Sequence, residues 1–354
     1  MSREKAFDLL YAEFRLAEKP AVWVVDENIS TADIPHPVEG IHAVTNRVDV
    51  AERLTALGWP CCFQDYELSD FTAGHFKTFL LRIPKEKAQA HTLINQAARL
   101  LSGAGKLILT GLKQEGIKGF IQRAETLSSE SAELWKADKE TWAGSISFLS
   151  PSNNPPLDDK EYAQIRQQPT DTYFSFWSKP GIFGWDKIDK GSELLIEHLQ
   201  DLLSDTLTPT KALDIGCGYG YLSLHAARLL NIPITATDNN AAAIIACRRN
   251  FEAFLVNGQV VADNCASGIK EQFPLVICNP PFHSGFGVDN DLTDRFLASA
   301  AQHLMPEGTA VFVTNLHVPL ERKATAYFKQ CETPIASPNF KLIKLRQPKR
   351  SPQS

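Results

Sequence analysis

A buried strand in the second half of the chain ends in residues that could bind a planar amine. The apolar run Leu275–Cys278 is followed by Asn279, Pro280, Pro281 and Phe282. The side-chain oxygen of Asn279 and the carbonyl of Pro280 can each accept a hydrogen bond, and the prolines fix the direction of that carbonyl. Phe282 offers a ring face on which a base can stack.

These residues could also make such an amine reactive. An exocyclic amine on a ring is a poor nucleophile because its lone pair is delocalised. Two hydrogen bonds to the Asn279 and Pro280 oxygens would draw the nitrogen toward a tetrahedral shape and free the lone pair. We therefore assign catalysis to Asn279, Pro280, Pro281 and Phe282. We expect His283 to shape the pocket, since no strong base is needed when the proton leaves a cationic nitrogen.

A glycine-rich turn about sixty residues earlier predicts a cofactor site. Gly216, Gly218 and Gly220 follow a predicted strand, Lys211–Ile215, that carries Asp214. Glycines allow a tight turn and let the backbone approach a ligand at the start of a helix. The spacing GxGxG after an acid differs from the GxGxxG of dinucleotide-binding turns. An ordinary strand-to-helix turn is the alternative for the glycines alone.

Two further polar pairs follow strands of the same half. Asp238 and Asn239 end the predicted strand Ile234–Asp238, where a carboxylate can accept both hydroxyls of a ribose. The alternative is a helix cap, for which Asn239 or Asn240 is the better candidate. Asp263 and Asn264 follow Val260–Ala262, and a turn residue is the alternative there. We assign Asp238 and Asn239 to cofactor binding, with Asp214, Asn279 and the three glycines, while the same assignment for Asp263 and Asn264 rests on the family resemblance given below.

The elements that position these residues alternate between strand and helix in both halves. This pattern predicts an α/β fold with mostly parallel sheets. The stretches AARLLSGAGKLILTG, from Ala97, and AAQHLMPEGTAVFVTN, from Ala300, align without a gap as helix, turn and strand. Upstream, LLRIPKEK lies where LVICNPPF lies in the second half. We infer a duplicated domain whose first copy, with Ile83-Pro84-Lys85, has lost the asparagine and the aromatic residue.

Composition limits the kinds of partner. The net charge of −5 excludes a protein that binds nucleic acid through its overall charge, so a local basic face would be needed. Near the C-terminus several basic residues form either such a face or a solubilising tail: Lys341, Lys344, Arg346, Lys349 and Arg350. The seven cysteines lack metal-binding spacing and suit a reducing cytoplasm, and no apolar run has transmembrane length.

Together these motifs resemble the bacterial ribosomal RNA guanine-N2 methyltransferases, in particular the small-subunit enzymes. The turn GCGYG after Asp214 resembles the first motif of S-adenosylmethionine-dependent methyltransferases, and NPPFH resembles their amine-methylating motif. PGIFGWDKIDKGSELLIEHL, from Pro180, resembles the segment that precedes the glycine turn in this family. Gly184-Trp185 departs from it, where the family more often has Ser-Arg. The resemblance implies that Asp263 contacts the adenine amine.

The resemblance implies two tandem Rossmann-like methyltransferase domains, the N-terminal one degenerate. We predict a degenerate domain over residues 1–150, a linker over 151–172 and a catalytic domain over 173–354. The implied reaction is methyl transfer from S-adenosylmethionine to the 2-amino group of a guanine in 16S ribosomal RNA, within a small-subunit particle or assembly intermediate. We expect a cytoplasmic monomer, without a metal site or a membrane partner.

Three alternatives remain open at this point. The large-subunit (23S) guanine-N2 enzymes share NPPFH. Protein-glutamine N5-methyltransferases use a related motif with tyrosine in place of Phe282. A non-enzymatic RNA-binding or assembly factor would not need an intact Asp238 and Asn279. For the first half, we predict RNA contacts at Lys113, Lys118 and Arg123, for which a solvated helix face is the alternative.

Overall fold

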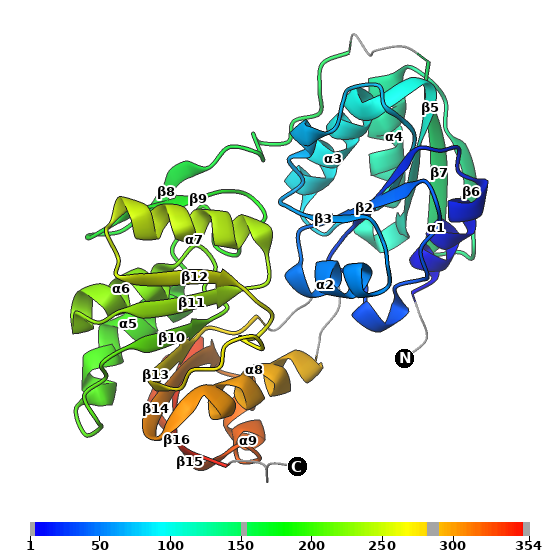
Figure 1. The fold of residues 1–354 in the computed structure, drawn as a ribbon. Coiled ribbons are helices and arrows are strands. Elements are labelled where there is room, and N and C mark those ends of the chain that lie inside the picture. The colour runs from blue at the N-terminus through cyan, green and yellow to red at the C-terminus, as the bar shows by residue number, and fades with distance from the viewer. Residues whose placement is uncertain (1–3, 150–153, 282–289, 350–354) are drawn as a thin grey trace. The chain divides into compact units, whose positions relative to one another are not determined.

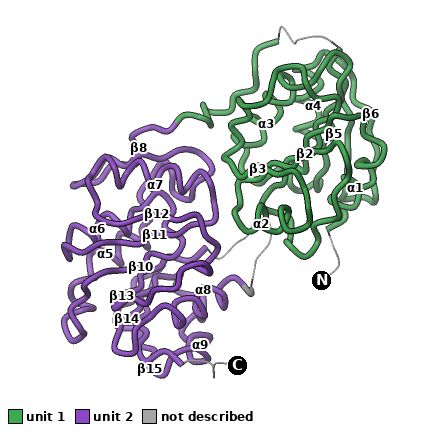
Figure 2. The backbone as a smooth tube through the Cα atoms, in the orientation of Figure 1, with its two compact units in different colours: residues 1–164, 285–287 green, residues 165–284, 288–354 purple. Residues whose placement is uncertain are grey.

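The computed structural model describes residues 4–149, 154–281 and 290–349. It divides into two compact units, unit 1 up to Gln164 and unit 2 from Ile165 onward (Figure 2). The division falls inside the segment predicted as a linker, residues 151–172. Residues 154–164 belong to unit 1, where the Tyr162 hydroxyl donates to the buried Asp65 carboxylate at 2.8 Å. Part of the remainder, Arg166–Thr170, is a strand of unit 2.

Unit 1 is a seven-stranded sheet with helices on both faces (Figure 1). The strand order is β3-β2-β1-β4-β5-β7-β6, in which the first five strands are parallel and the last two pairings are antiparallel. Its elements are α1 (Lys5–Leu16), β1 (Ala21–Val25), β2 (Ile41–Thr45), α2 (Val48–Ala56), β3 (Cys61–Phe63), β4 (Phe76–Arg82), α3 (Lys87–Leu100), β5 (Leu101–Leu112), α4 (Ile117–Ser128), β6 (Glu133–Lys136) and β7 (Thr141–Phe148).

Unit 2 repeats this arrangement with the order β12-β11-β10-β13-β14-β16-β15. An antiparallel pair, β8-β9, precedes the repeated part. Its elements are β8 (Arg166–Thr170), β9 (Ser175–Ser178), α5 (Lys190–Leu203), β10 (Ala212–Ile215), α6 (Tyr221–Leu230), β11 (Ile234–Asp238), α7 (Ala241–Ala253), β12 (Gly258–Ala262), β13 (Phe273–Cys278), α8 (Asn290–His303), β14 (Leu304–Asn315), α9 (Leu320–Ala324), β15 (Phe328–Ala336) and β16 (Phe340–Pro348).

The same irregularity occurs in both sheets. In unit 1 the register between β4 and β5 shifts after Phe76 pairs with Leu101. In unit 2 the register between β13 and β14 shifts after Phe273 pairs with Leu304. The gap-free alignment of Ala97 with Ala300 places Leu101 on Leu304, so the strand pairing agrees with it. The structure therefore supports the inference of a duplicated domain.

One part of the predicted alignment is wrong by two residues. With the bulges superposed, Leu81 of β4 matches Cys278 of β13, so Arg82 stands in the place of Asn279. The alignment of LLRIPKEK with LVICNPPF had placed Pro84 there. The offset escapes a comparison of the two sequences because the connection after β13 is longer than the one after β4. Unit 1 has thus replaced the asparagine by an arginine.

Helix α6 has no counterpart in the described part of unit 1. In unit 2, α5, α6 and α7 cover one face of the sheet, while α8 and α9 cover the other. In unit 1, α1 and α2 cover one face, and α3 and α4 cover the other. Between β1 and β2, unit 1 has the 3-10 turn η1 (Thr31–Asp33) and neither the glycine turn nor the helix that follows it.

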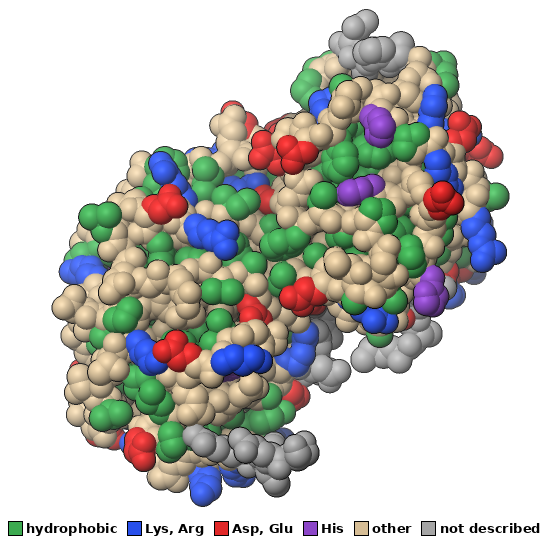
Figure 3. Space-filling view, in the orientation of Figure 1, with side chains coloured by type: hydrophobic (Ala, Val, Ile, Leu, Met, Phe, Trp, Pro, Cys, Tyr) green, Lys and Arg blue, Asp and Glu red, His purple; other side chains and the backbone are tan. Residues whose placement is uncertain are grey.

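The basic residues near position 345 form part of the sheet. Lys341 and Lys344 lie on β16, between β14 and β15, and are only 7% and 5% exposed. Lys341 pairs with Glu321 at 2.7 Å, and Lys344 pairs with Asp205. Both predictions made from this cluster, a solubilising tail and an exposed basic face, are therefore wrong for these two lysines. On the face drawn in Figure 3, Lys and Arg are interspersed with Asp and Glu.

Candidate functional site

The predicted site residues of unit 2 meet at one edge of its sheet. Strands β10, β11 and β13 are parallel, so Gly216, Asp238 and Asn279, which follow or end them, lie at the same edge. The strand order reverses between β10 and β13. In open α/β sheets, ligands bind outside the carboxyl ends of the strands at such a switch point. The fold thus gathers groups from three separate parts of the sequence.

The glycine turn needs glycine for different reasons at different positions. All three glycines have left-handed φ angles, with 55° at Gly218 and 93° at Gly220. A Cβ at Gly220 would lie 2.9 Å from Cys247 Sγ, whereas a Cβ at Gly218 would meet its nearest atom at 3.9 Å. Gly218 is therefore required for its backbone angle and Gly220 also for space. The turn leads directly into the N-terminus of α6.

Asp238 joins the glycine turn to the two neighbouring segments. Its Oδ2 accepts the N–H of Gly218 at 2.9 Å, and its Oδ1 accepts the N–H of Asn240 at 2.9 Å. Its main-chain carbonyl accepts the N–H of Asp263 at 2.9 Å. Burial raises the pKa of the Asp238 carboxyl, against the lowering effect of these N–H donors. The N–H of Asn239 acts on the same carboxylate, which still has acceptor capacity that a hydroxyl could use.

The side chain that caps α7 is Asn240. Its Oδ1 accepts the N–H of Ala242 at 2.8 Å, and its Nδ2 donates to the carbonyl of Gly181 at 3.4 Å. Of the residues considered for this cap, the structure uses Asn240, one of the two that the sequence favoured over Asp238. Asn239 is half-buried beside it, and its role in cofactor binding stays a prediction.

Asp214 lies beneath the turn and is fully buried. Ser223 of α6 donates its hydroxyl to Asp214 Oδ2 at 2.6 Å, and Oδ1 has no hydrogen-bond partner among the described residues. Burial raises the pKa of Asp214 to about 7, although the Ser223 hydroxyl acts in the opposite direction. This arrangement favours support of the turn from below, and direct contact with a cofactor stays a prediction.

The carboxylate of Asp263 is engaged in its own turn. Its Oδ1 accepts the hydroxyl of Ser267 at 3.0 Å, and its Oδ2 accepts the N–H of Gly268 at 2.8 Å. This observation favours the turn role that the sequence had left open. Asn264 is half-buried next to it. The predicted adenine contact of Asp263, and the cofactor role of Asn264, stay predictions.

Asn279 is held by the start of α5. Its Nδ2 donates to Asp189 Oδ2 at 2.9 Å and to Ser192 Oγ at 2.8 Å. Pro280 is buried and Pro281 is exposed, and their predicted roles in catalysis stay predictions. The predicted roles of Phe282 and His283 fall on residues outside the described part of the chain. Their assignments stay predictions.

Sequence reasoning did not single out Asp189 and Ser192. Both lie in the segment from Pro180 that carried the family resemblance, and the spacing Asp-x-x-Ser at a helix start is a recognisable cap pattern. The same segment brings Ile182 to 3.9 Å from the position of a Cβ on Gly218. Where the family more often has arginine, the ring of Trp185 lies 5.2 Å from the guanidinium of Arg166 on β8.

Comparisons with known proteins agree with this geometry. Residues 173–344 match the model of the family described as "Methyltransferase small domain". The ribosomal RNA small subunit methyltransferase C of Aeromonas hydrophila is 30% identical over 292 residues, which cover 81% of each chain.

This chain belongs to the ribosomal RNA small subunit methyltransferase C family. The enzyme of the same name from Psychromonas ingrahamii is 28% identical over 273 residues, which cover 76% of this chain and 75% of that one. The membership covers both units, because these alignments are much longer than unit 2 alone.

A solved structure shows the family's fold over nearly the whole chain. It is described as T. thermophilus 16S rRNA N2 G1207 methyltransferase in complex with AdoMet and guanosine. It matches with a TM-score of 0.83 at 23% identity and covers 98% of this chain and 92% of that chain. The predicted fold class, two tandem Rossmann-like domains, is confirmed. No helix among the described residues is long and apolar enough to cross a bilayer.

Proposed function

We propose that this chain transfers a methyl group from S-adenosylmethionine to the exocyclic 2-amino group of a guanine in 16S ribosomal RNA. The observation that carries the proposal is Asn279 at the end of β13, next to the glycine turn and Asp238 at the switch point of the sheet. Family membership supports the same reaction, because its curated members are named for small-subunit ribosomal RNA.

The groups at the sheet edge fit this cofactor. The Asp238 carboxylate has lone pairs for the ribose hydroxyls, and the glycine turn brings backbone close to the ligand without side chains. S-adenosylmethionine supplies an electrophilic methyl group on a cationic sulfur. Carboxylates such as Asp238 favour a cation nearby through charge attraction. A phosphate-bearing dinucleotide would suit this acidic edge less well.

The residues of the chain would then act on the substrate amine. The two N–H groups of the guanine amine donate to Asn279 Oδ1 and to the Pro280 carbonyl, which directs the nitrogen lone pair toward the methyl carbon. The new C–N bond forms as the C–S bond breaks, with its electron pair left on sulfur. One proton then leaves the methylated nitrogen to water.

We further propose that the substrate is presented in a small-subunit particle or assembly intermediate, to a cytoplasmic monomer. A guanine inside a helix must leave its stack before its amine can reach Asn279. The names of the relatives favour the small-subunit over the large-subunit enzymes. They also favour RNA over protein glutamine as the substrate.

Labelled S-adenosylmethionine tests the proposal directly. The purified chain is incubated with small subunits, large subunits, free 16S RNA and a glutamine-containing peptide. We expect label only with the small-subunit substrates, recovered as N2-methylguanosine after digestion. Mapping should begin at nucleotide 1207, which the solved neighbour's name specifies. Label in the large subunit or in the peptide would contradict the proposal.

A further inference from the structure

The amide of Asn279 is fixed by two residues that are outside the predicted catalytic set. Asp189 is the N-cap of α5 and accepts the N–H of Ser192 at 2.8 Å through the same Oδ2 that receives the amide of Asn279. Ser192 Oγ receives the other N–H of that amide at 2.8 Å, and Ser192 is 7% exposed. The three side chains form a closed group at the end of β13.

The chemistry of Asp189 determines which way the amide faces. An ionised carboxylate can only accept hydrogen bonds, so it must face the NH₂ of Asn279 and not the oxygen. The oxygen then points away from α5. An amide turned by 180° would present its NH₂ to the substrate amine, which is also a donor. Such a pair could not form the hydrogen bond on which activation depends.

We propose that Asp189 and Ser192 are positioning residues that hold the Asn279 side-chain oxygen toward the substrate amine. This inference rests on the proposed function. It assigns a task to the first turn of α5, namely to remove the flipped, unproductive orientation of the amide before substrate arrives. Preorganised groups lower a barrier because they need not reorient during the reaction.

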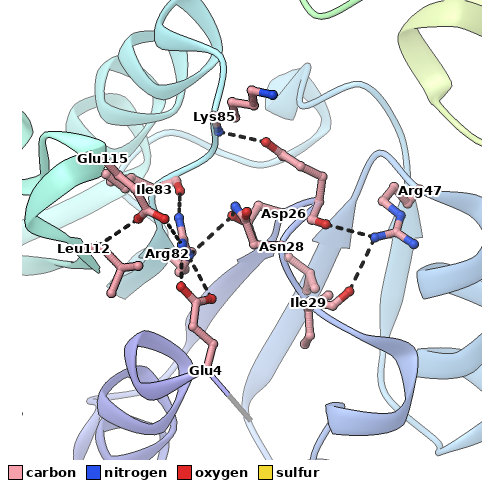
Figure 4. Close-up of polar contacts among 12 residues, drawn as sticks. Glu4, Asp26, Asn28, Ile29, Arg47, Arg82, Ile83, Lys85, Leu112 and Glu115 are labelled. Carbon is pink, nitrogen blue, oxygen red and sulfur yellow. Dashed lines mark hydrogen bonds and ion pairs between the residues drawn. The ribbon is translucent and has the colours of Figure 1, made fainter. Parts of the chain in front are cut away.

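Unit 1 contains the same contact with a different partner. Arg82 stands in the place of Asn279, and Glu4, the N-cap of α1, binds it at 2.6 Å (Figure 4). Glu115 also binds Arg82 at 2.6 Å, and the guanidinium is buried among these carboxylates. An acid at the N-cap position of a helix therefore contacts the strand-end residue in both units, although only Asp189 also makes a side-chain capping hydrogen bond. The residue at the strand end decides whether this acid orients an amide or neutralises a cation.

Gly191 makes room for the carboxylate of Asp189. A Cβ at position 191 would lie 3.1 Å from Asp189 Oδ2 and 3.0 Å from the ring of Phe340. Gly191→Ala would therefore crowd the carboxylate and the ring of Phe340 without removing any polar group. It offers a second variant that disturbs the orientation of Asn279 by a different route.

Steady-state kinetics of the full chain on small subunits tests the proposal. Asp189→Asn is nearly the same size, but its amide can face Asn279 with either its oxygen or its NH₂. We expect kcat to fall on the order of 10- to 100-fold, with the KM for RNA and the affinity for S-adenosylmethionine unchanged. Ser192→Ala and Gly191→Ala should reduce kcat. Ser192→Thr keeps the hydroxyl and should therefore retain the kcat of the parent chain. Glu193→Gln removes a charge from the same helical turn and should leave kcat unchanged.

A double variant separates positioning from simple structural support. In the Asn279→Ala background, Asp189→Asn should have no further effect on kcat, because no amide remains to be oriented. The same fractional loss in both backgrounds, or an unchanged kcat for Asp189→Asn alone, would overturn the proposal. Failure of the parent chain to methylate any RNA would instead refute the proposed function. A loss in Asn279→Ala without a loss in Asp189→Asn would refute the positioning role alone.

Discussion

In the proposed reaction, Asn279 uses one hydrogen-bonding atom, its side-chain oxygen, on the substrate amine. None of the described residues donates to this oxygen, whereas both N–H groups of the amide are engaged by α5. The residue is also at the end of a fully buried strand, so its backbone position is set by the sheet. A residue held in this way suits a contact that is made mainly in the transition state.

Asn279→Ala should separate binding from chemistry. We expect the affinity for S-adenosylmethionine to change little and methyl transfer to fall by about two orders of magnitude or more, as for the loss of one preorganised contact. Calorimetry gives the affinity and single-turnover labelling gives the rate. Turnover that survives with only a raised KM would mean that Asn279 merely binds, and the proposed mechanism would be wrong.

Asp214 should make the stability of unit 2 depend on pH. Its pKa is raised to about 7 in the folded state by burial, while an unfolded chain gives about 3.9. Between these values the folded state keeps a proton that the unfolded state has lost. The contribution of Asp214 is therefore present below about pH 4 and falls by about 1.4 kcal/mol per pH unit as pH rises through this window.

Asp214→Asn should remove this part of the pH dependence. Hydrogen exchange of peptides from β10, corrected for the intrinsic pH effect, measures the opening free energy of unit 2. We expect a flatter dependence between pH 4 and 7 in the variant. Asp186→Asn, at an exposed position, should keep the slope of the parent chain. An unchanged slope in Asp214→Asn would show that the buried carboxyl is not the group that titrates.

At the scale of elements, the buried parallel strands of unit 2 were predictable, and the antiparallel strand β16 was not. Strand β13 is buried at every position, so its run of apolar residues was visible in the sequence. Strand β16 carries lysines whose stems lie along the sheet while their ammonium groups pair with Glu321 and Asp205. Asp205 lies more than a hundred residues from Lys344 in the sequence, and Glu321 lies on another element than Lys341. The sequence alone therefore indicated only a basic cluster.

In the site, too, local features were predictable and contacts between distant parts of the sequence were not. The positions of four residues in the turn and at the strand end were predictable, because tight turns and strand ends have local signatures: Gly216, Gly218, Gly220 and Asp238. The contact of Asn279 with Asp189 joins residues 90 positions apart, and the replacement of an asparagine by Arg82 depends on where a bulge falls. Neither relation has a local signal. Both become visible only when the strands are paired.

The element that connects β9 to the glycine turn is α7, through Asn250. This side chain is fully buried, and its Oδ1 accepts the N–H of Trp177 at 2.7 Å. Its Nδ2 donates to the carbonyls of Trp177 at 2.8 Å and Tyr219 at 2.7 Å. One amide thus ties together the hairpin, the helix and the turn.

Asn250→Ala should weaken both the fold and the cofactor site. Three backbone groups lose their partner at once, and each such loss costs about 1–3 kcal/mol before relaxation or water entry. We expect a clear fall in the melting temperature of unit 2 and a weaker affinity for S-adenosylmethionine. Asn257→Ala, at an exposed asparagine, is the matched control and should change neither. A stable variant with reduced affinity alone would show that the tie serves only the turn.

At the scale of the whole molecule, most residues that we assign to the cofactor have no equivalent in unit 1. Strands β1 and β2 pair in the same register as β10 and β11, so Thr45 of unit 1 stands in the place of Asp238. The N–H of Gln64 donates to the carbonyl of Thr45 as the N–H of Asp263 donates to that of Asp238, so Gln64 stands in the place of Asp263. It has no glycine turn after β1, and Arg82 replaces Asn279. The glycine turn, Asp238, Asp263 and Asn279 are thus altered in unit 1, whereas Asn46 keeps the asparagine of Asn239.

Separate production of the two units tests this division. We expect the chain from residue 165 onward to bind S-adenosylmethionine and the chain up to residue 164 not to bind it, by calorimetry. The full chain with Asp238→Ala should lose binding, since unit 1 provides no second site. Binding by the N-terminal piece, or residual stoichiometric binding in Asp238→Ala, would contradict the division.

Unit 1 offers a candidate surface for RNA instead. Lys113, Lys118 and Arg123 are exposed, and the ammonium of Lys118 lies 3.8 Å from the ring centre of Trp142. Lys136 lies 5.4 Å from the same ring. Cations around a half-buried aromatic ring suit contacts with phosphates and bases.

Replacement of Lys113, Lys118 and Arg123 by alanine should weaken RNA binding and reduce its dependence on salt. The slope of log K against log salt should change by about 2–3 if all three neutralise phosphates. Affinity for S-adenosylmethionine should stay the same. A control variant with three other exposed cations of unit 1 replaced should keep the parent slope: Arg15, Arg53 and Lys106. An unchanged slope in the first variant would leave unit 1 as a structural support.

The strand order also determines when each unit can fold during synthesis. Strand β16 lies between β14 and β15 although the ribosome makes it after both. Until residues 340–348 have emerged, β14 has an open edge and β15 has no neighbour, whereas unit 1 has all its strands once residue 148 is made. Open strand edges recruit other chains. A nascent chain stopped at residue 339 would therefore carry a folded unit 1 attached to a unit 2 that is exposed to aggregation and dependent on chaperones.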